Sequence, residues 1–161
     1  MSMEKYNKIH FIGIGGISMS SLAEILKSKG KTITGSDGVA SNVTKALENI
    51  GIQVSIGQKA ENITPDIDLI VYTAAVKEDN PELMAARASG IETVDRAALV
   101  GMMMLEYKFP LSVAGTHGKT TTSSLVTEIF LEANTNPTVS IGGILPSIKG
   151  NYKVGGEDYF I

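Results

Sequence analysis

The sequence predicts an α/β fold in which a parallel sheet is covered by helices on both faces. Short apolar runs of strand length alternate with segments whose apolar residues recur at helical spacing. Two glycine clusters follow strand-like runs, and each cluster leads into a helix-like segment. Strands separated by helices of this length pair in parallel, because each crossover helix returns the chain to the end of the sheet at which the previous strand began.

The first elements follow this alternation. Residues 8–14, "KIHFIGI", form an apolar run that ends in glycines, which is typical of a buried strand. The helix after it ends near Gly30. Further strands are expected over residues 31–35 and 52–56, with a helix over residues 42–50 between them. The first helix carries its apolar residues at Met19, Leu22, Ala23, Ile25 and Leu26.

The next elements repeat the pattern, with a strand over residues 68–74, a helix over 81–89 and a strand over 91–94. Asn80 can cap the helix, and Pro81 suits its first position. Asp95 can cap a further helix, which carries Ala98, Leu99, Met102 and Met103. We expect the methionines at 102–104 to fill the core.

A domain boundary is expected near residues 106–110, "EYKFP", because Pro110 disfavours helix in the residue before it. A new apolar strand, "LSVAG" at 111–115, is predicted to start there. The chain is therefore interpreted as a domain of residues 1–107 followed by residues 108–161 of a second domain. Residues 108–161 are expected to form only a strand, a helix and a strand, whose unpaired edges would leave them mobile or paired with another copy.

Composition excludes several classes of function. The chain has 161 residues, of which 43% are hydrophobic and 19% are charged, as in globular proteins. A net charge of -3 gives no reason to expect a nucleic-acid partner, and no run is long enough to span a membrane. Because cysteine is absent and only two histidines occur, thiol chemistry is excluded and a zinc site is not expected. A cytoplasmic location is the default expectation.

The first glycine cluster, "GIGGISMS" at 13–20, stands where a strand passes into a helix, as diphosphate-binding turns do. Gly13 allows the tight turn and Gly15 a close backbone approach, but Ser18 stands where the dinucleotide fingerprint has its third glycine. Asp37, at the end of the second strand, is placed to accept hydrogen bonds from ribose hydroxyls. The cluster alone leaves three interpretations open: a structural turn, an NAD site, or a site for another diphosphate ligand.

The second cluster, "VAGTHGKTTTSS" at 113–124, has the parts of a triphosphate loop although Val113 replaces its usual first glycine. Gly115 and Gly118 give backbone freedom, Lys119 gives positive charge, and Thr120 offers a hydroxyl to Mg²⁺. Thr121 supports the start of the helix, and the alternative is a threonine-rich helix start with no ligand. Of the two histidines, His117 is expected to have a positioning role, and His10 to be a hydrogen-bonded core residue.

Taken together, these motifs resemble the Mur ligases. The resemblance covers essentially the whole chain in order, and these ligases use a shortened loop of the form G-T-x-G-K-T/S, so Val113 is not a departure. The motifs that carry it are "IHFIGIGGISMSSLAEIL", "GSD", "DNPE", "VAGTHGKTTTSSLV" and the pair Gly142 and Gly143.

The resemblance implies an ATP-dependent amide ligase of peptidoglycan synthesis, most similar to the members that join L-alanine to UDP-N-acetylmuramate through an acyl phosphate. It also implies two sets of site residues. The UDP-sugar would be held by Gly13, Gly15, Gly16, Ile17, Ser18, Ser36 and Asp37, with looser matches at Thr73, Asn80 and Arg96. ATP would be held by Gly115, Thr116, His117, Gly118, Lys119, Thr120 and Thr121, with Lys119 neutralising the transferred phosphoryl group and Thr120 binding Mg²⁺.

The resemblance also defines what a chain of this length lacks. Mur ligases have three domains, and the domain that brings the amino acid has no counterpart in these 161 residues. We therefore expect this chain to bind the UDP-sugar but to be inactive alone. Three alternatives stay open: a sister ligase that attaches a peptide to UDP-N-acetylmuramate, an NAD-binding Rossmann module, and a noncatalytic interaction fragment.

Overall fold

The chain folds into two compact units in the computed structural model, which describes residues 3–161. The first unit contains residues 3–101 and the second contains residues 102–161. The division falls inside helix α4 (Arg96–Met104), which follows directly from strand β5. The assignment of a UDP-sugar-binding domain up to residue 107 and an ATP-binding portion after it stays a prediction.

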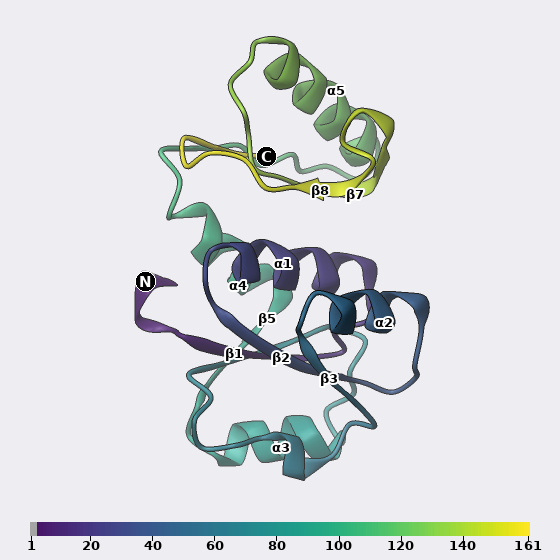
Figure 1. Cartoon of the computed structure of the whole chain (residues 1–161), viewed down its shortest axis with the longest axis vertical. Helices are drawn as coiled ribbons and strands as arrows, with labels where there is room; N and C mark the ends of the chain where they lie inside the picture. Colours follow the sequence, from purple (N-terminus) through teal and green to yellow (C-terminus); the bar gives the residue numbers. More distant parts are fainter. Residues whose placement is uncertain (1–2) are drawn as a thin grey trace. The chain divides into compact units, whose positions relative to one another are not determined.

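The first unit is built on a five-stranded parallel sheet (Figure 1). Its strand order is β3-β2-β1-β4-β5, so the chain moves outward in one direction from β1 and then returns to the other side of β1. The predicted α/β fold with a parallel central sheet is confirmed. The strands are β1 (Lys8–Ile12), β2 (Thr32–Asp37), β3 (Gln53–Ile56), β4 (Leu69–Tyr72) and β5 (Glu92–Asp95).

Helices cover both faces of this sheet. Figure 1 shows α1 (Ile17–Ser28) and α2 (Asn42–Asn49) on one face and α3 (Pro81–Ala88) on the other. Both predicted caps are confirmed: Asn80 Oδ1 accepts hydrogen bonds from the amides of Glu82 and Leu83 at 3.0 and 3.1 Å, and Asp95 Oδ1 accepts one from the Ala98 amide at 2.7 Å. Short 3₁₀ helices occupy Met3–Lys5 and Ala60–Asn62.

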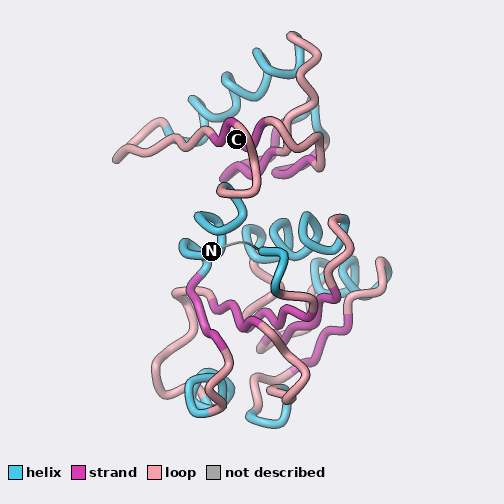
Figure 2. Tube along the Cα trace, turned by 90° about the vertical axis from the view of Figure 1, so that its left-hand side faces the viewer, coloured by secondary structure: helices cyan, strands magenta, loops and turns pink. Residues whose placement is uncertain are grey.

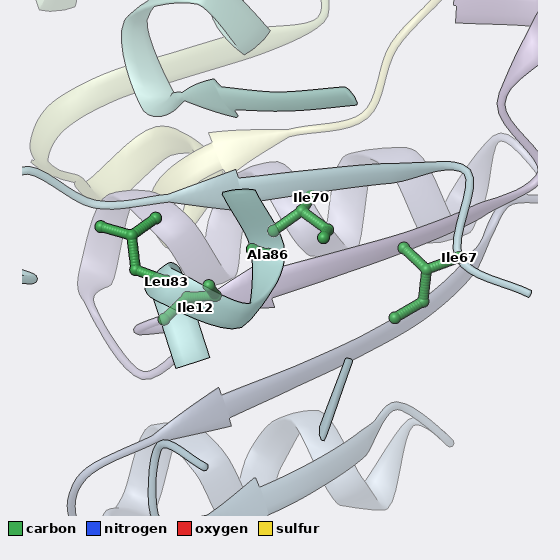
Figure 3. Packing of buried hydrophobic residues seen from close by; sticks show 5 residues of the cluster. All are labelled: Ile12, Ile67, Ile70, Leu83 and Ala86. Atoms are coloured by element: carbon green, nitrogen blue, oxygen red, sulfur yellow. The ribbon is translucent and has the colours of Figure 1, made fainter. Parts of the chain in front are cut away.

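Part of the core lies between α3 and the sheet (Figure 3). Ile12 of β1, Ile70 of β4, and Leu83 and Ala86 of α3 are all fully buried, and Ile67 closes the cluster. Removing a buried leucine side chain typically costs about 2–5 kcal/mol, so this layer fixes α3 against β1 and β4. Of the three methionines, Met102 and Met103 are buried as predicted, whereas Met104 is half-buried.

The second unit is more complete than the sequence predicts. Its strands, magenta in Figure 2, lie to one side of α5 (Lys119–Glu132), which packs on β7. Strand β7 (Val139–Leu145) pairs antiparallel with β8 (Gly150–Lys153), and β6 (Phe109–Pro110) pairs parallel with β9 (Tyr159–Phe160). A 3₁₀ turn over Pro146–Ile148 joins β7 to β8.

Two expectations for this unit were wrong. The predicted strand over residues 111–115 is not formed, and the pairing with β9 is made instead by the preceding residues Phe109 and Pro110. The Leu111 amide still donates to the Phe160 carbonyl at 2.7 Å, after which the chain leaves the sheet. The predicted pattern of strand, helix and strand is also incomplete, since it lacks the β7–β8 hairpin and the return of the chain to β6.

Candidate functional site

A cleft of about 620 Å³ opens at the carboxyl ends of β1, β2 and β4 in the first unit. The chain reverses its direction of travel across the sheet between β1 and β4, and open α/β sheets bind their ligands at such switch points. The residues that line the cleft come from the loops after the strands and from the start of α3. They are Gly13, Gly16, Asp37, Gln58, Thr73, Ala75, Val76, Lys77, Asp79, Asn80 and Pro81.

The turn after β1 depends on Gly13. Its φ is +85°, and a Cβ atom there would lie 2.6 Å from Cγ2 of Thr73, another residue of the cleft. The amides of Gly13 and Ile14 both donate to the Ser36 carbonyl at 2.9 Å, so the end of β2 holds the turn in place. A larger residue at position 13 would have to displace either the turn or the opposite wall of the cleft.

Gly15 makes a close approach, but to Asp37. The Gly15 amide donates to Oδ2 of Asp37 at 2.8 Å, and a Cβ atom on Gly15 would lie 2.7 Å from that same oxygen. Oδ1 of Asp37 accepts a weaker bond from the Val39 amide at 3.2 Å. Asp37 therefore braces the loop as well as lining the cleft, and Gly16 is the loop residue that faces the cleft beside Gly13.

The other predicted residues are divided among three environments. Thr73 and Asn80 line the cleft. At the start of α1, Nη1 of Arg96 donates to Oγ of Ser18 at 3.2 Å, and the neighbouring Ile17 side chain is 68% exposed. Contrary to expectation, Ser36 does not line the cleft: its side chain is fully buried and points toward α3, because successive residues of a strand face opposite sides of the sheet.

Sequence reasoning missed Gln58 and Lys77. Oε1 of Gln58 accepts a hydrogen bond from Nδ2 of Asn80 at 2.7 Å, which joins the loop after β3 to the start of α3. Lys77 is the only basic residue among those that line the cleft. Both residues follow the carboxyl end of a strand. Because ligands of such sheets bind at the carboxyl ends of the strands, the predicted strand positions were the signal that could have placed these two loops at the site.

A buried polar network lies beside the cleft. Nε2 of His10 is 2.8 Å from Oε1 of Glu82, and its Nδ1 is 2.8 Å from Oγ1 of Thr34. The Ser36 hydroxyl donates to Oε2 of Glu82 at 2.5 Å. His10 is thus a hydrogen-bonded core residue, as predicted. His10 and Thr34 also line a second, smaller cavity of about 150 Å³.

The second glycine loop leads into α5. Gly115 and Gly118 have φ values of +155° and +77°, and Gly118 occupies the N-cap of the helix without a side-chain cap. Nζ of Lys119 bonds back to the carbonyls of Gly115 and Thr116 at 2.5 and 3.2 Å. The side chains of Thr116, His117, Thr120 and Thr121 are exposed. Exposed amides at a helix start, together with a lysine, fit a phosphate ligand.

The uncapped helix starts coincide with the two glycine clusters. Gly16 before α1 and Gly118 before α5 give no side-chain cap, whereas Ser41 caps α2 and Asn80 caps α3. The first amides of a helix have no partner within the helix. The two helices that follow glycine clusters therefore present the positive ends of their dipoles with no capping side chain, which favours an anionic ligand.

Thr120 lies where α5 meets β7. A Cβ atom on Gly142 would lie 3.2 Å from Oγ1 of Thr120, and one on Gly143 would lie 2.8 Å from its Cγ2. The two glycines of β7 thus give the start of α5 room against the strand. Within residues 3–161, no group of three or more acidic or histidine side chains is placed to hold a metal ion. The role of Thr120 as a Mg²⁺ ligand stays a prediction.

The parallel sheet, the glycine turn after β1 and the cleft at the switch point define a Rossmann-like unit. The model of the Mur ligase family, catalytic domain, matches residues 8–108. The chain belongs to the Mur ligase family. Among the described residues, none of the helices has the length and apolarity needed to cross a membrane.

Curated relatives and solved structures agree with this membership. The UDP-N-acetylmuramate--L-alanine ligases of Agathobacter rectalis and Acetivibrio thermocellus are 60% and 54% identical over 95% and 98% of this chain. The chain spans 33% of the length of each of these relatives. The crystal structure of the UDP-N-acetylmuramate-alanine ligase MurC of Thermotoga maritima matches 95% of this chain and 36% of its own, with a TM-score of 0.83 at 36% identity.

A second solved structure has a different amine substrate in its name. The UDP-N-acetylmuramate:L-alanyl-gamma-D-glutamyl-meso-diaminopimelate ligase of Neisseria meningitides matches 97% of this chain and 52% of its own. Its TM-score is 0.84 at 27% identity. The fold of this chain is therefore shared by Mur ligases that accept either an amino acid or a peptide.

Proposed function

We propose that residues 3–101 bind UDP-N-acetylmuramate and that the chain is part of an ATP-dependent ligase that joins L-alanine to this UDP-sugar. The observation that carries the proposal is the cleft at the switch point, which Gly13 and Gly16 line together with Lys77 and Asn80 at the carboxyl ends of the strands. The names of the most similar curated relatives support this substrate pair.

The cleft contains the groups that a nucleotide diphosphate needs. The start of α1, beside Gly16 of the cleft lining, supplies the positive end of a helix dipole, and Lys77 supplies positive charge. Arg96, held beside Ser18, adds a second cation near this helix start. Asp37, Gln58 and Asn80 supply hydrogen-bonding groups for the ribose and the sugar.

The second unit supplies the proposed ATP loop. ATP transfers its γ-phosphoryl group to the muramate carboxylate with loss of ADP, and the L-alanine amine then attacks the acyl carbon with loss of phosphate. In this account Lys119 leaves the carbonyls of Gly115 and Thr116 and neutralises charge on the transferred group. Thr120 offers its hydroxyl to the Mg²⁺ that accompanies ATP, and the amides of residues 115–121 hold the phosphates. We place this reaction in the cytoplasm, where ATP is available.

The choice of L-alanine over a peptide rests on similarity. Relatives that carry the L-alanine name are 60% and 54% identical, whereas the peptide ligase from Neisseria meningitides is 27% identical. The NAD-binding alternative explains the turn at Gly13 but gives no role to the uncapped helix start at Gly118. An interaction fragment with no ligand gives no role to the cleft.

Titration calorimetry with UDP-N-acetylmuramate and, in separate samples, with NAD tests the proposal. We expect heat of binding with the UDP-sugar and none with NAD. Lys77→Met should weaken binding about tenfold, since hydrogen bonds to charged groups contribute roughly 1.5–3 kcal/mol. Lys45→Met is the matched control, because Lys45 is an exposed lysine of α2 outside the cleft. Binding of NAD alone would contradict the proposal.

A further inference from the structure

The buried carboxylate of Glu82 holds an unusual position in the first unit. Glu82 is the second residue of α3 and its side chain has no exposure to solvent. Its two oxygens each have one partner: Oε1 is 2.8 Å from Nε2 of His10, and Oε2 accepts the Ser36 hydroxyl at 2.5 Å. Carboxylates are rarely buried unless they are paired, because their desolvation is costly. Helix capping by Asn80 does not require this arrangement.

Ser36 connects Glu82 to the glycine turn. Its side chain bonds to Glu82, while its carbonyl accepts the amides of Gly13 and Ile14 at 2.9 Å each. One residue of β2 therefore holds both the turn after β1 and the start of α3. These are two walls of the cleft, since Gly13 and Gly16 come from the turn between β1 and α1, whereas Asn80 and Pro81 come from the start of α3.

The opposite end of the network is anchored in the sheet. Nδ1 of His10, on β1, is 2.8 Å from Oγ1 of Thr34, on β2. His10 and Thr34 border the smaller cavity of about 150 Å³. At this end the side chains border a hollow, and His10 has a hydrogen-bond partner at each ring nitrogen.

We propose that the chain Thr34–His10–Glu82–Ser36 is a positioning device that holds the glycine turn and the start of α3 at the separation the diphosphate ligand requires. Ser36, Glu82 and His10 are then positioning residues, which act on the ligand through Gly13 and Asn80. The ligand in this inference rests on the function proposed above, whereas the coupling between the two walls rests on the hydrogen bonds alone.

Amide hydrogen exchange tests the coupling without any ligand. Ser36→Ala should raise the exchange rates of the Gly13 and Ile14 amides and also those of Glu82 and Leu83, each about fivefold or more, as expected for roughly one lost hydrogen bond. Thr34→Val removes the far end of the network while keeping the side-chain shape, so it should raise the same two sets of rates by a smaller factor.

Ser89→Ala is the matched control for exchange. Its hydroxyl donates to the Ala86 carbonyl at 2.6 Å, at the other end of α3 from the cleft. The control should leave the amides of Gly13 and Ile14 unchanged. The proposal is overturned if Ser36→Ala affects only the turn and not α3, or if Ser89→Ala produces the same changes as Ser36→Ala.

Binding of UDP-N-acetylmuramate supplies the second readout. Ser36→Ala and Glu82→Gln should each raise the dissociation constant about tenfold, a change of about 1.4 kcal/mol, while Ser89→Ala leaves it unchanged. Equal binding by the native chain and both network variants would overturn the proposal. If the native chain binds no UDP-sugar, the proposed function fails, and the exchange measurement still decides whether the two walls are coupled. If Glu82→Gln does not fold, Ser36→Ala and Thr34→Val decide the outcome.

Discussion

At the scale of single residues, the turn at Gly13 makes the sharpest stability prediction. Gly13→Ala introduces a side chain at φ +85° and places its Cβ 2.6 Å from Thr73. Gly30→Ala is the matched control, because Gly30 has the same φ of +85° and no atom within 4 Å of a Cβ. Backbone strain alone costs about 1–2 kcal/mol, and crowding adds typically 1–3 kcal/mol.

Chemical denaturation of both variants separates these two contributions. We expect Gly13→Ala to lower the free energy of unfolding by more than Gly30→Ala, and to weaken UDP-sugar binding, which Gly30→Ala leaves unchanged. Equal losses of stability in the two variants would show that Thr73 moves aside without cost and that crowding adds nothing to the backbone strain at Gly13.

The ion pair of Lys8 and Asp66 makes a prediction about pH. Hydrogen bonds from Lys8 and then Thr64 lower the pKa of Asp66 to about 2. Because the pKa is lower in the folded chain, the pair stabilises the fold above the unfolded value of 3.8, and this contribution is lost as the pH falls through about 2.

Carbon-13 NMR titration of the Asp66 carboxyl group measures this pKa. Lys8→Gln should raise the pKa of Asp66 toward its usual value, since it removes the largest cause of the shift. Lys5→Gln is the control, because Lys5 pairs with Glu92 instead, at 3.0 Å. An unchanged Asp66 pKa in Lys8→Gln would contradict the assigned cause.

Residue patterns predicted part of the site, for reasons visible at individual positions. Gly13, Asp37, Thr73 and Asn80 all line the cleft, because they lie at strand ends or just before a helix, and their role as substrate contacts stays a prediction. Ser36 was misplaced because a motif gives the order of residues and not the face of the strand on which each side chain lies. The pairing of His10 with Glu82 joins residues 72 positions apart, which no local pattern reports.

At the scale of elements, the Asn80 side chain at the start of α3 should affect stability and UDP-sugar binding separately. Asn80→Ala removes the cap and should destabilise the first unit by about 1 kcal/mol. Asn80→Asp keeps the cap oxygen but removes the amide that donates to Gln58 at 2.7 Å. We expect Asn80→Asp to weaken UDP-sugar binding with little loss of stability.

Thermal denaturation and calorimetry of the two Asn80 variants test this separation. Equal destabilisation by Asn80→Asp and Asn80→Ala would contradict the prediction, because the cap would then not be the stabilising contact. Unchanged binding by Asn80→Asp would show that its bond to Gln58 does not shape the cleft.

The contact of α5 with β7 makes a second prediction about an element. Gly143→Ala places a Cβ 2.8 Å from Cγ2 of Thr120 and should destabilise the second unit by about 1–3 kcal/mol. Gly150→Ala, on the partner strand β8, makes only ordinary contacts of 3.8 Å or more and is the matched control. Hydrogen exchange of the α5 amides measures the effect, and equal rates in the two variants would contradict it.

Sequence periodicity predicted the elements of the first unit closely and those of the second unit poorly. In the first unit the central strands β1 and β4 are buried beneath helices, so apolar runs and helical spacing mark its elements. In the second unit β6 and β9 contain two residues each, and strands this short show no recognisable hydrophobic periodicity. Their pairing joins Phe109 to Tyr159, fifty positions along the chain.

At the scale of the whole molecule, the two units should respond to different ligands. The cleft lies entirely within residues 3–101, and the second glycine loop lies within residues 102–161. The chain spans 33% of the length of its curated relatives, so the reaction itself is a property proposed for a longer protein. Binding of the UDP-sugar is the part of the proposed function that can be tested with this chain.

The most direct test is a thermal melt of this chain with UDP-N-acetylmuramate, with NAD and with Mg-ATP, each in a separate sample. A ligand at a hundredfold excess over its dissociation constant adds about 2.7 kcal/mol of stability, which raises the midpoint by several degrees for a chain of this size. We predict a rise with the UDP-sugar and none with NAD. A rise with NAD alone would contradict the assignment of the cleft to a Mur ligase substrate.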